Sequence, residues 1–234
     1  MVGLHPIHTI SQEVDEEESH FVSREEKFDY EFYRKLAQDP LVVGIGECGL
    51  DYYRVPDGMG LGQVKEIQRN AFLQQIKLAK ELDKALVIHC RPSKDLETKK
   101  DSTDAYEDIL EILRGELSTN GVSGTNSLRF EIHSFTSNWQ IARQFLELGG
   151  YIGMNGIITF DKSGVLREVA TNVPLEKIVL ETDAPYLAPG PFRGKRCLPE
   201  YVKYTAEFVA EVKGISVDQV AVQTTKNAKA LFII

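Results

Sequence analysis

Four residues able to bind a metal ion follow short apolar runs of the sequence: Glu47, His89, His133 and Asp183. The apolar runs that precede them cover residues 41–46, 85–88, 128–132 and 178–180. Two imidazoles and two carboxylates suit Zn²⁺, Mn²⁺ or Mg²⁺ and hydrolytic chemistry better than iron–sulfur or copper redox chemistry. A single such residue is more often structural, but four in equivalent places favour a metal-dependent hydrolase in which Asp183 accepts the proton of an attacking water.

The elements that would position these residues are short buried strands separated by helices. The apolar runs are continuous and rich in β-branched residues, which is typical of parallel strands buried on both faces. A further run covers 151–154, and residues 2–4 resemble the end of another strand. Helical periodicity between the runs predicts an α/β protein with parallel strands. Because strand ends of a parallel α/β barrel open on one face, we expect the four residues to converge there within reach of shared metal ions.

Helix boundaries are indicated at three places. Ser23 and Ser216 are each followed three residues later by Glu or Gln, which is the pattern of a capping box at a helix start. Gly214 follows an apolar helical stripe and predicts a helix end. The four acidic residues at 15–18 are expected in a solvated loop.

The composition sets limits on the class of protein. The chain has 234 residues, of which 42% are hydrophobic and 26% charged, as in globular proteins that bury one core. No apolar run approaches the ~20 residues needed to cross a bilayer, so we expect no membrane association. Three cysteines without a C-x-x-C motif argue against a disulfide framework and predict the reducing cytoplasm, or the nucleus in a eukaryote.

The net charge of −8 excludes nucleic-acid binding through the overall field of the protein. Positive charge for binding phosphodiesters must therefore be local, from metal ions or a small basic patch. One such patch is Arg193, Lys195 and Arg196, which is equally consistent with a solvated loop and with a phosphate contact.

Two motifs with other meanings are rejected. Residues 44–49 form a G-x-G-x-x-G pattern, but a loop rather than a helix is expected after it, which argues against a dinucleotide site. No G-x-S-x-G nucleophile motif occurs.

The motifs, taken in order, resemble the TatD family of metal-dependent deoxyribonucleases over essentially the whole chain. The resembling segments are Val2-Gly3-Leu4-His5-Pro6, Gly44-Ile-Gly-Glu47-Cys-Gly-Leu-Asp51-Tyr-Tyr-Arg54, Val87-Ile-His89-Cys-Arg91, Ile132-His133-Ser-Phe-Thr136, Tyr151-Ile-Gly-Met-Asn155-Gly and Leu180-Glu-Thr-Asp183-Ala-Pro-Tyr186-Leu-Ala-Pro189. A weaker match is Gly194-Lys195-Arg196.

The resemblance implies a TIM-type (β/α)8 barrel of the amidohydrolase kind, with one or two divalent metal ions (Mg²⁺, Mn²⁺ or Zn²⁺) at the strand ends. It implies hydrolysis of DNA phosphodiester bonds, typically from the ends of the strand, with single strands or 3′ ends as substrate.

The resemblance also assigns roles to residues. Glu47 would join both metal positions, and His89 and His133 would complete the second. Asp183 would serve the first position and take the proton of the attacking water, so Glu47 and Asp183 are the expected catalytic residues. Two further residues, His5 and Arg91, would face the phosphate of the substrate.

The sequence departs from the family at its start. Family members begin with a strand carrying a His-x-His pair that binds the first metal, and this sequence contains no such pair. We count six candidate strands where a closed barrel has eight. We therefore expect a single domain over 1–234, truncated at its N-terminus, with about six of eight βα units. Such a chain should hold at most one ion tightly and show weak nuclease activity or none. A smaller departure is Cys197, where the family usually has Asn.

Two alternatives to a nuclease remain open. One is an amidohydrolase-type esterase that acts on a substrate other than nucleic acid. The other is a non-catalytic remnant that binds a partner, because the first pair of metal ligands is absent and an incomplete barrel would expose strand edges.

Overall fold

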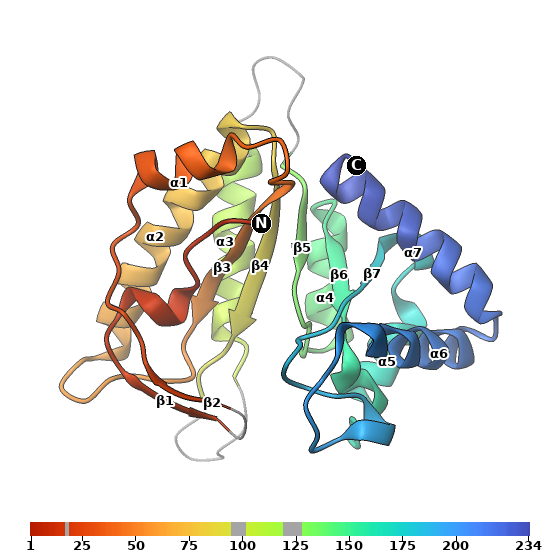
Figure 1. The fold of residues 1–234 in the computed structure, drawn as a ribbon. Coiled ribbons are helices and arrows are strands. Elements are labelled where there is room, and N and C mark those ends of the chain that lie inside the picture. The colour runs from red at the N-terminus through yellow and green to blue at the C-terminus, as the bar shows by residue number, and fades with distance from the viewer. Residues whose placement is uncertain (17–18, 95–101, 119–127) are drawn as a thin grey trace. The chain divides into compact units, whose positions relative to one another are not determined.

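The computed structural model describes residues 1–16, 19–94, 102–118 and 128–234 (Figure 1). The chain forms two compact units, Met1–Phe130 and Glu131–Ile234, and each is described by itself. The expected single domain over 1–234 stays a prediction.

The first unit is built around two parallel strands, β3 (Gly44–Asp51) and β4 (Ala85–Arg91). Their register shifts between Ile45 and Cys48, after which Gly49 lies opposite His89. Val2 forms an isolated parallel bridge with Ile45, so the expected N-terminal strand is reduced to one residue pair. The other elements of this unit are η1 (Pro6–Thr9), β1 (Glu13–Glu16), β2 (Ser19–Val22), α1 (Tyr30–Ala37), α2 (Leu61–Glu81) and α3 (Asp104–Ser118).

Helices α2 and α3 pack against this strand pair through an apolar face. Val64, Phe72 and Ile76 of α2 are completely buried, as the helical spacing of these apolar residues requires. Two buried glutamines on the same face, Gln68 and Gln75, bond the backbone of Asp51 and Leu4. The helix thus holds the two segments that carry candidate site residues.

The second unit contains the parallel strands β5 (Phe130–Ile132), β6 (Tyr151–Met154) and β7 (Ile178–Leu180), in that order, with Phe130 as the last residue of the first unit. Helices α4, α6 and α7 pack on β6 and β7. Elements other than the strands are α4 (Trp139–Glu147), η2 (Gly156–Thr159), α5 (Val165–Asn172), η3 (Leu175–Lys177), η4 (Gly190–Phe192), η5 (Pro199–Tyr201), α6 (Val202–Lys213) and α7 (Val217–Phe232).

The prediction of an α/β protein with parallel strands is confirmed, and the strands at 151–154 and 178–180 have the predicted bounds. Ser216 caps α7 by accepting a hydrogen bond from the amide of Gln219, and Gly214 ends α6 in the left-handed conformation, both as predicted. No helix in the described part of the chain is long and apolar enough to cross a membrane.

Two local predictions are wrong. Ser23 does not cap a helix, because its hydroxyl donates to the carbonyl of Ile10 and accepts from the amide of Gln12. The helix begins instead at Tyr30, where the carboxylate of Asp29 accepts from the amide of Phe32. Of the acidic residues expected in a loop, 15 and 16 belong to strand β1, and 17–18 lie outside the described residues.

Candidate metal-binding clusters

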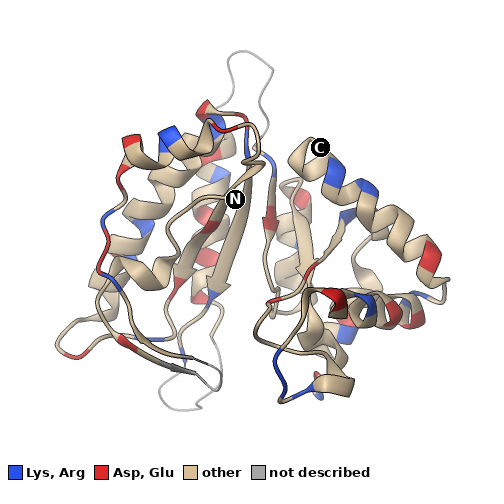
Figure 2. Cartoon of the chain, viewed as in Figure 1, with Lys and Arg blue, Asp and Glu red and all other residues tan. Residues whose placement is uncertain are grey.

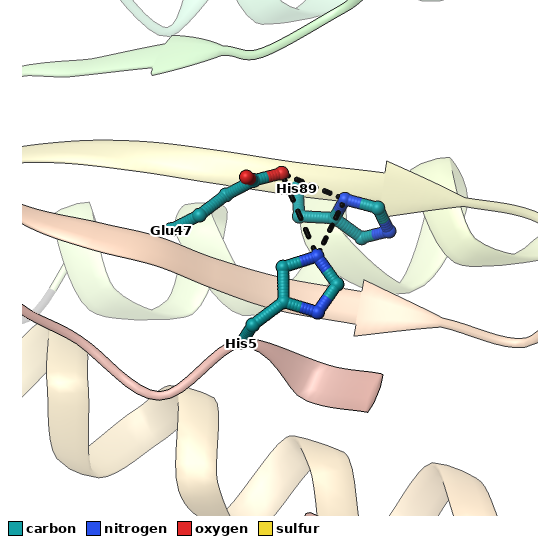
Figure 3. Close-up of side chains that lie close together, drawn as sticks. All are labelled: His5, Glu47 and His89. Atoms are coloured by element: carbon teal, nitrogen blue, oxygen red, sulfur yellow. Dashed lines mark hydrogen bonds and ion pairs between the residues drawn. The ribbon is translucent and has the colours of Figure 1, made fainter. Parts of the chain in front are cut away.

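The first unit brings together His5, Glu47, Asp51 and His89, which we call the β3–β4 cluster (Figure 3 draws all but Asp51). The ligand atoms of His5, Glu47 and His89 all lie within 4.8 Å of one another, as the atoms around one cation would. Glu47 Oε1 is 2.8 Å from His89 Nδ1 and 3.7 Å from His5 Nε2. The geometry therefore joins a carboxylate and two imidazoles from three separate segments of the chain.

Both nitrogens of His89 face a carboxylate. Nε2 lies 3.0 Å from Oδ2 of Asp51, whose residue is only 4% exposed, while Nδ1 faces the more open Glu47. A histidine that binds a metal usually donates its second ring N–H to a carboxylate, which fixes the tautomer and the ring orientation. Asp51 is placed to do this, leaving Nδ1 of His89 as the ligand atom.

The charges of this cluster favour a bound cation. Burial lowers the pKa of His89, but the hydrogen bonds and charges of Asp51 and Glu47 outweigh it and raise that pKa to about 9. Burial raises the pKa of Asp51, yet the bond to His89 and the nearby positive charges bring it below its usual value. The site therefore stabilises positive charge, and a metal ion entering it replaces a proton.

His5 differs from the other imidazole of the cluster. Its Nδ1 accepts a hydrogen bond of 3.1 Å from the amide of Ile7. Burial, and then the charge of His89, lower the pKa of His5, so the ring is neutral. A neutral imidazole carries one N–H, which must then be at Nε2, the nitrogen that lies 3.7 Å from Oε1 of Glu47. His5 is thus a donor, which suits a contact to substrate better than metal ligation.

The second unit contains a second group, the β5–β7 cluster, formed by His133, Ser134, Asn155, Glu181 and Asp183. His133 Nδ1 lies 2.6 Å from Glu181 Oε2, and His133 Nε2 lies 3.1 Å from Asp183 Oδ1. The other oxygen of Glu181 accepts from the amide of Ser134. Buried Asn155 donates to the Ser134 hydroxyl at 2.7 Å. As with His89, one ring nitrogen is held by an acid and the other faces a second carboxylate.

A glycine on β6 permits this arrangement. His133 follows β5 and Glu181 follows β7, so the Glu181 side chain must cross β6 to reach the imidazole. At Gly153 a Cβ atom would lie 2.5 Å from Glu181 Oε1 and 2.9 Å from the carbonyl oxygen of Ile132. Any side chain there would displace the carboxylate.

The predicted site residues fall into two groups in the structure. Glu47 is paired with His89, and His133 with Asp183. The expectation that all four surround shared metal ions stays a prediction, because the two pairs belong to different units. One positional expectation is wrong, since Glu47 and His89 lie inside β3 and β4 rather than after them. The strand β3 continues to Asp51 because its pairing with β4 resumes after the register shift.

Arg91, expected to contact substrate, ends β4 opposite Asp51. Its guanidinium lies 3.8 Å from the ring centre of Tyr53, and Lys94 lies over the same ring at 4.5 Å. This end of β4 therefore carries positive charge beside the β3–β4 cluster.

Sequence reasoning missed two site residues, Asp51 and Glu181, although both stood in the quoted motifs. For Asp51 the signal was spacing along β3, because Asp51 is four residues after Glu47, an even offset that places side chains on one face of a strand. Glu181 lies after the end of β7, so strand spacing gave no such signal for it. Each orients an imidazole that the spacing alone did not connect to it.

The donor set fits a divalent cation. Each cluster offers a carboxylate and an imidazole nitrogen, with the second nitrogen of the imidazole held by another acid. Zn²⁺, Mn²⁺ and Mg²⁺ accept such oxygen and nitrogen ligands.

Known proteins are similar to this chain in sequence and in fold. A family model described as TatD related DNase matches residues 1–233. The chain is 38% identical to the uncharacterized metal-dependent hydrolase YcfH of Escherichia coli K12 over 215 residues, 91% of this chain and 71% of the relative. It is 35% identical to the uncharacterized metal-dependent hydrolase YabD of Bacillus subtilis over 233 residues, covering 99% and 76%.

One relative has a more specific name. The 3'-5' ssDNA/RNA exonuclease TatD of Erwinia amylovora is 35% identical over 205 residues, covering 85% of this chain and 69% of the relative. Among solved structures, YjjV, a TatD homologue from Escherichia coli, matches with a TM-score of 0.76 at 24% identity, over 100% of this chain and 76% of that one.

Proposed function

From the premise that the chain belongs to the TatD family of metal-dependent hydrolases, we propose that it cleaves phosphodiester bonds of DNA, working from the ends of single strands. The observation that carries the proposal is the repeated arrangement of a histidine between two carboxylates in the two clusters. The relative from Erwinia amylovora, named as a 3'-5' ssDNA/RNA exonuclease, supports this class of substrate.

One or two divalent ions would be held by Glu47 and His89 and by His133 and Asp183. When bound, such an ion polarises a phosphoryl oxygen and makes a bound water more acidic. Asp51 and Glu181 keep the two imidazoles in the tautomer and orientation that ligation needs.

The side chains of the protein supply the remaining functions. Asp183 accepts the proton of the attacking water through its carboxylate. His5 donates its Nε2–H to a phosphate oxygen, which its neutral state and the amide of Ile7 allow. Arg91 contributes a positive charge to the same phosphate.

The test is hydrolysis of a 5′-labelled single-stranded oligonucleotide by metal-depleted protein, with Mg²⁺, Mn²⁺ or Zn²⁺ added back. We expect a low rate, since the sequence has no His-x-His pair, and the readout is therefore its dependence on metal and on Glu47. The Glu47→Gln variant should remove the metal-dependent part. Labelled products that shorten one nucleotide at a time from the 3′ end support exonucleolytic cleavage, whereas early labelled products of scattered length contradict it.

A parallel panel separates the alternatives. Metal-dependent cleavage of a carboxylic ester without cleavage of DNA would replace the nuclease by an esterase. Protein that binds no metal and cleaves neither substrate would indicate a binding remnant.

A further inference from the structure

The segment between η4 and η5 carries three positive charges on an exposed loop, Arg193, Lys195 and Arg196, which we call the basic loop (Figure 2 colours Lys and Arg blue). Within the part of the chain that the structure describes, none of the three forms an ion pair with a carboxylate. In a protein of net charge −8, this is a local excess of positive charge without an internal partner among the described residues.

The conformation of the basic loop is fixed by its backbone. Gly194 adopts a φ of +79°, and the amide of Lys195 donates to the carbonyl of Phe192 at 2.9 Å, which closes a tight turn. Before the turn, the amide of Gly190 donates to the hydroxyl of Thr159 at 2.7 Å. The ring of Phe192 stacks on Tyr201 with 4.3 Å between ring centres. The three positive side chains therefore lie on a loop whose conformation is held by hydrogen bonds and by the stacking of Phe192 on Tyr201.

The far end of the basic loop is attached beside Asp183. The amide of Cys197 donates to the carbonyl of Pro185 at 2.8 Å, and Pro185 lies in the turn that the amide of Tyr186 closes onto the carbonyl of Asp183. Two hydrogen bonds thus connect the loop to the residue proposed to take the proton. If the phosphate to be cleaved in a bound single-stranded nucleic acid lies at Asp183, its neighbouring phosphates would lie near the basic loop.

The cations are not needed to hold the loop together. Arg193 lies 4.6 Å from the ring centre of Phe160, but the side chains of Lys195 and Arg196 form no hydrogen bond, ion pair or ring contact with the described residues. Exposed cations of this kind add little to stability. Successive phosphates of a polyanion are the ligand that such spaced charges match, since phosphate contacts position a strand without reading its sequence.

We infer that the basic loop binds the backbone phosphates of single-stranded nucleic acid and holds the strand beside Asp183. The inference rests on the proposed function for its substrate class. It assigns binding, and not chemistry, to Lys195 and Arg196.

The test measures binding of the full chain to fluorescent oligothymidylate of 20 nucleotides by anisotropy, in EDTA, between 0.05 and 0.3 M salt, values chosen as roughly those where such binding is salt-sensitive. The variant is Lys195→Ala with Arg196→Ala. The matched control is Lys226→Ala with Lys229→Ala, which removes two exposed cations of α7 in the same unit. Thermal melts establish that both variants fold.

We expect the basic-loop variant to reduce the slope of log K against log salt by about 1.4, at about 0.7 for each lost phosphate contact, and to weaken binding roughly 25-fold at ~0.1 M salt. The α7 control should stay within about twofold of the wild type, because its charges are only a distant influence at that salt. Equal losses in both variants would overturn the inference, and so would wild-type protein that does not bind the oligonucleotide.

Separate hydrolysis assays of the wild type distinguish this inference from the proposed function. Binding through the basic loop without metal-dependent cleavage would refute the nuclease and leave the inference standing. Cleavage by a wild type whose binding ignores the loop would do the reverse. Equal loop-dependent binding to vesicles of anionic lipid would also overturn the inference, since the loop would then recognise anionic surfaces in general.

Discussion

The two clusters hold a histidine in the same way but reach that arrangement by different routes. In the β3–β4 cluster, Glu47 and Asp51 come from one strand and His89 from its direct neighbour. In the β5–β7 cluster, Glu181 reaches His133 across an intervening strand, over Gly153. The register of adjacent strands is enough to bring such groups together. A contact that crosses an intervening strand requires a glycine on that strand, because a side chain there would block it.

The routes also give the orienting acids different surroundings. Asp51 is buried and also accepts from the amide of Tyr53. Glu181 is supported by the amide of Ser134, which Asn155 holds in turn through the Ser134 hydroxyl. The first acid is fixed by the chain directly after its own strand, and the second by a network that extends over three segments. The second should therefore be easier to disturb from a distance.

The largest expected effect is on turnover. Asp183→Asn keeps the shape of the side chain and removes its capacity to accept a proton, so metal-dependent hydrolysis of single-stranded DNA should fall by roughly 10²–10⁴-fold. Initial rates at saturating metal measure the loss, and a circular dichroism spectrum equal to that of the wild type serves as the control. A rate within a few-fold of the wild type would remove Asp183 from the chemistry.

The number of metal ions that the chain retains tests which of the two clusters binds metal tightly. The sequence supplies no His-x-His pair, so after exhaustive dialysis the chain should retain at most one ion, and Glu47→Gln should lower the content toward zero. Elemental analysis of the dialysed proteins measures both. Two tightly held ions per chain would show that Asp183 and its neighbours need no further ligands.

The orienting acids should show a smaller effect. Asp51→Asn and Glu181→Gln each remove a charge from behind a ligand imidazole and should weaken metal affinity by about 10–100-fold. Competition with a chelating dye measures the affinity of each variant. If Asp51→Asn has no effect while Glu181→Gln does, then the first cluster is not the metal site and the comparison fails.

The sequence predicted the elements better than the contacts between them. The strands at 151–154 and 178–180 were found because their apolar runs are continuous and sharply bounded. The strand that carries Glu47 was cut short at 46, since its glycine-rich continuation reads as a turn and its pairing depends on β4. The role of Glu181 could not be predicted, because it depends on Gly153 lying between two strands whose order the sequence does not show.

Gly153→Ala tests whether the Glu181 side chain must pass over β6 to reach His133. The new methyl group would collide with the Glu181 carboxylate and with the carbonyl of Ile132, so the protein should lose about 1–3 kcal/mol of stability and bind metal more weakly. The control is Gly62→Ala on α2, where a Cβ atom meets nothing within 4 Å and a helical alanine should stabilise by about 0.5–1 kcal/mol. Urea unfolding measures both variants. An unchanged Gly153→Ala protein would mean that Glu181 does not need this gap.

The smallest expected effect comes from Asp161→Ala, a change in the second unit outside the β5–β7 cluster. It tests whether loss of stability in this unit alone weakens metal binding. Asp161 lies outside the cluster and accepts from the amides of Ser163 and Leu166 at the start of α5. Burial raises the pKa of Asp161, but the hydrogen bond from the hydroxyl of Ser163, together with those from the backbone amides, outweighs it and brings the pKa below its usual value. A lowered pKa in the folded state means that the stabilisation is present above the unfolded pKa, near 3.8, and is lost as the pH falls through the folded value.

Asp161→Ala should therefore cost about 1 kcal/mol at neutral pH, the usual value of a helix-capping side chain, and less in strong acid. Unlike Gly153→Ala, Asp161→Ala should leave metal affinity unchanged, since the Asp161 carboxylate accepts from Ser163 and Leu166, which lie outside the β5–β7 cluster. Thermal melts at two pH values and the dye competition measure the two quantities, with exposed Lys162→Ala as the neighbouring control. A loss of metal affinity in Asp161→Ala as large as in Gly153→Ala would mean that general loosening of the unit weakens the site, and that the crossing by Glu181 has no special role.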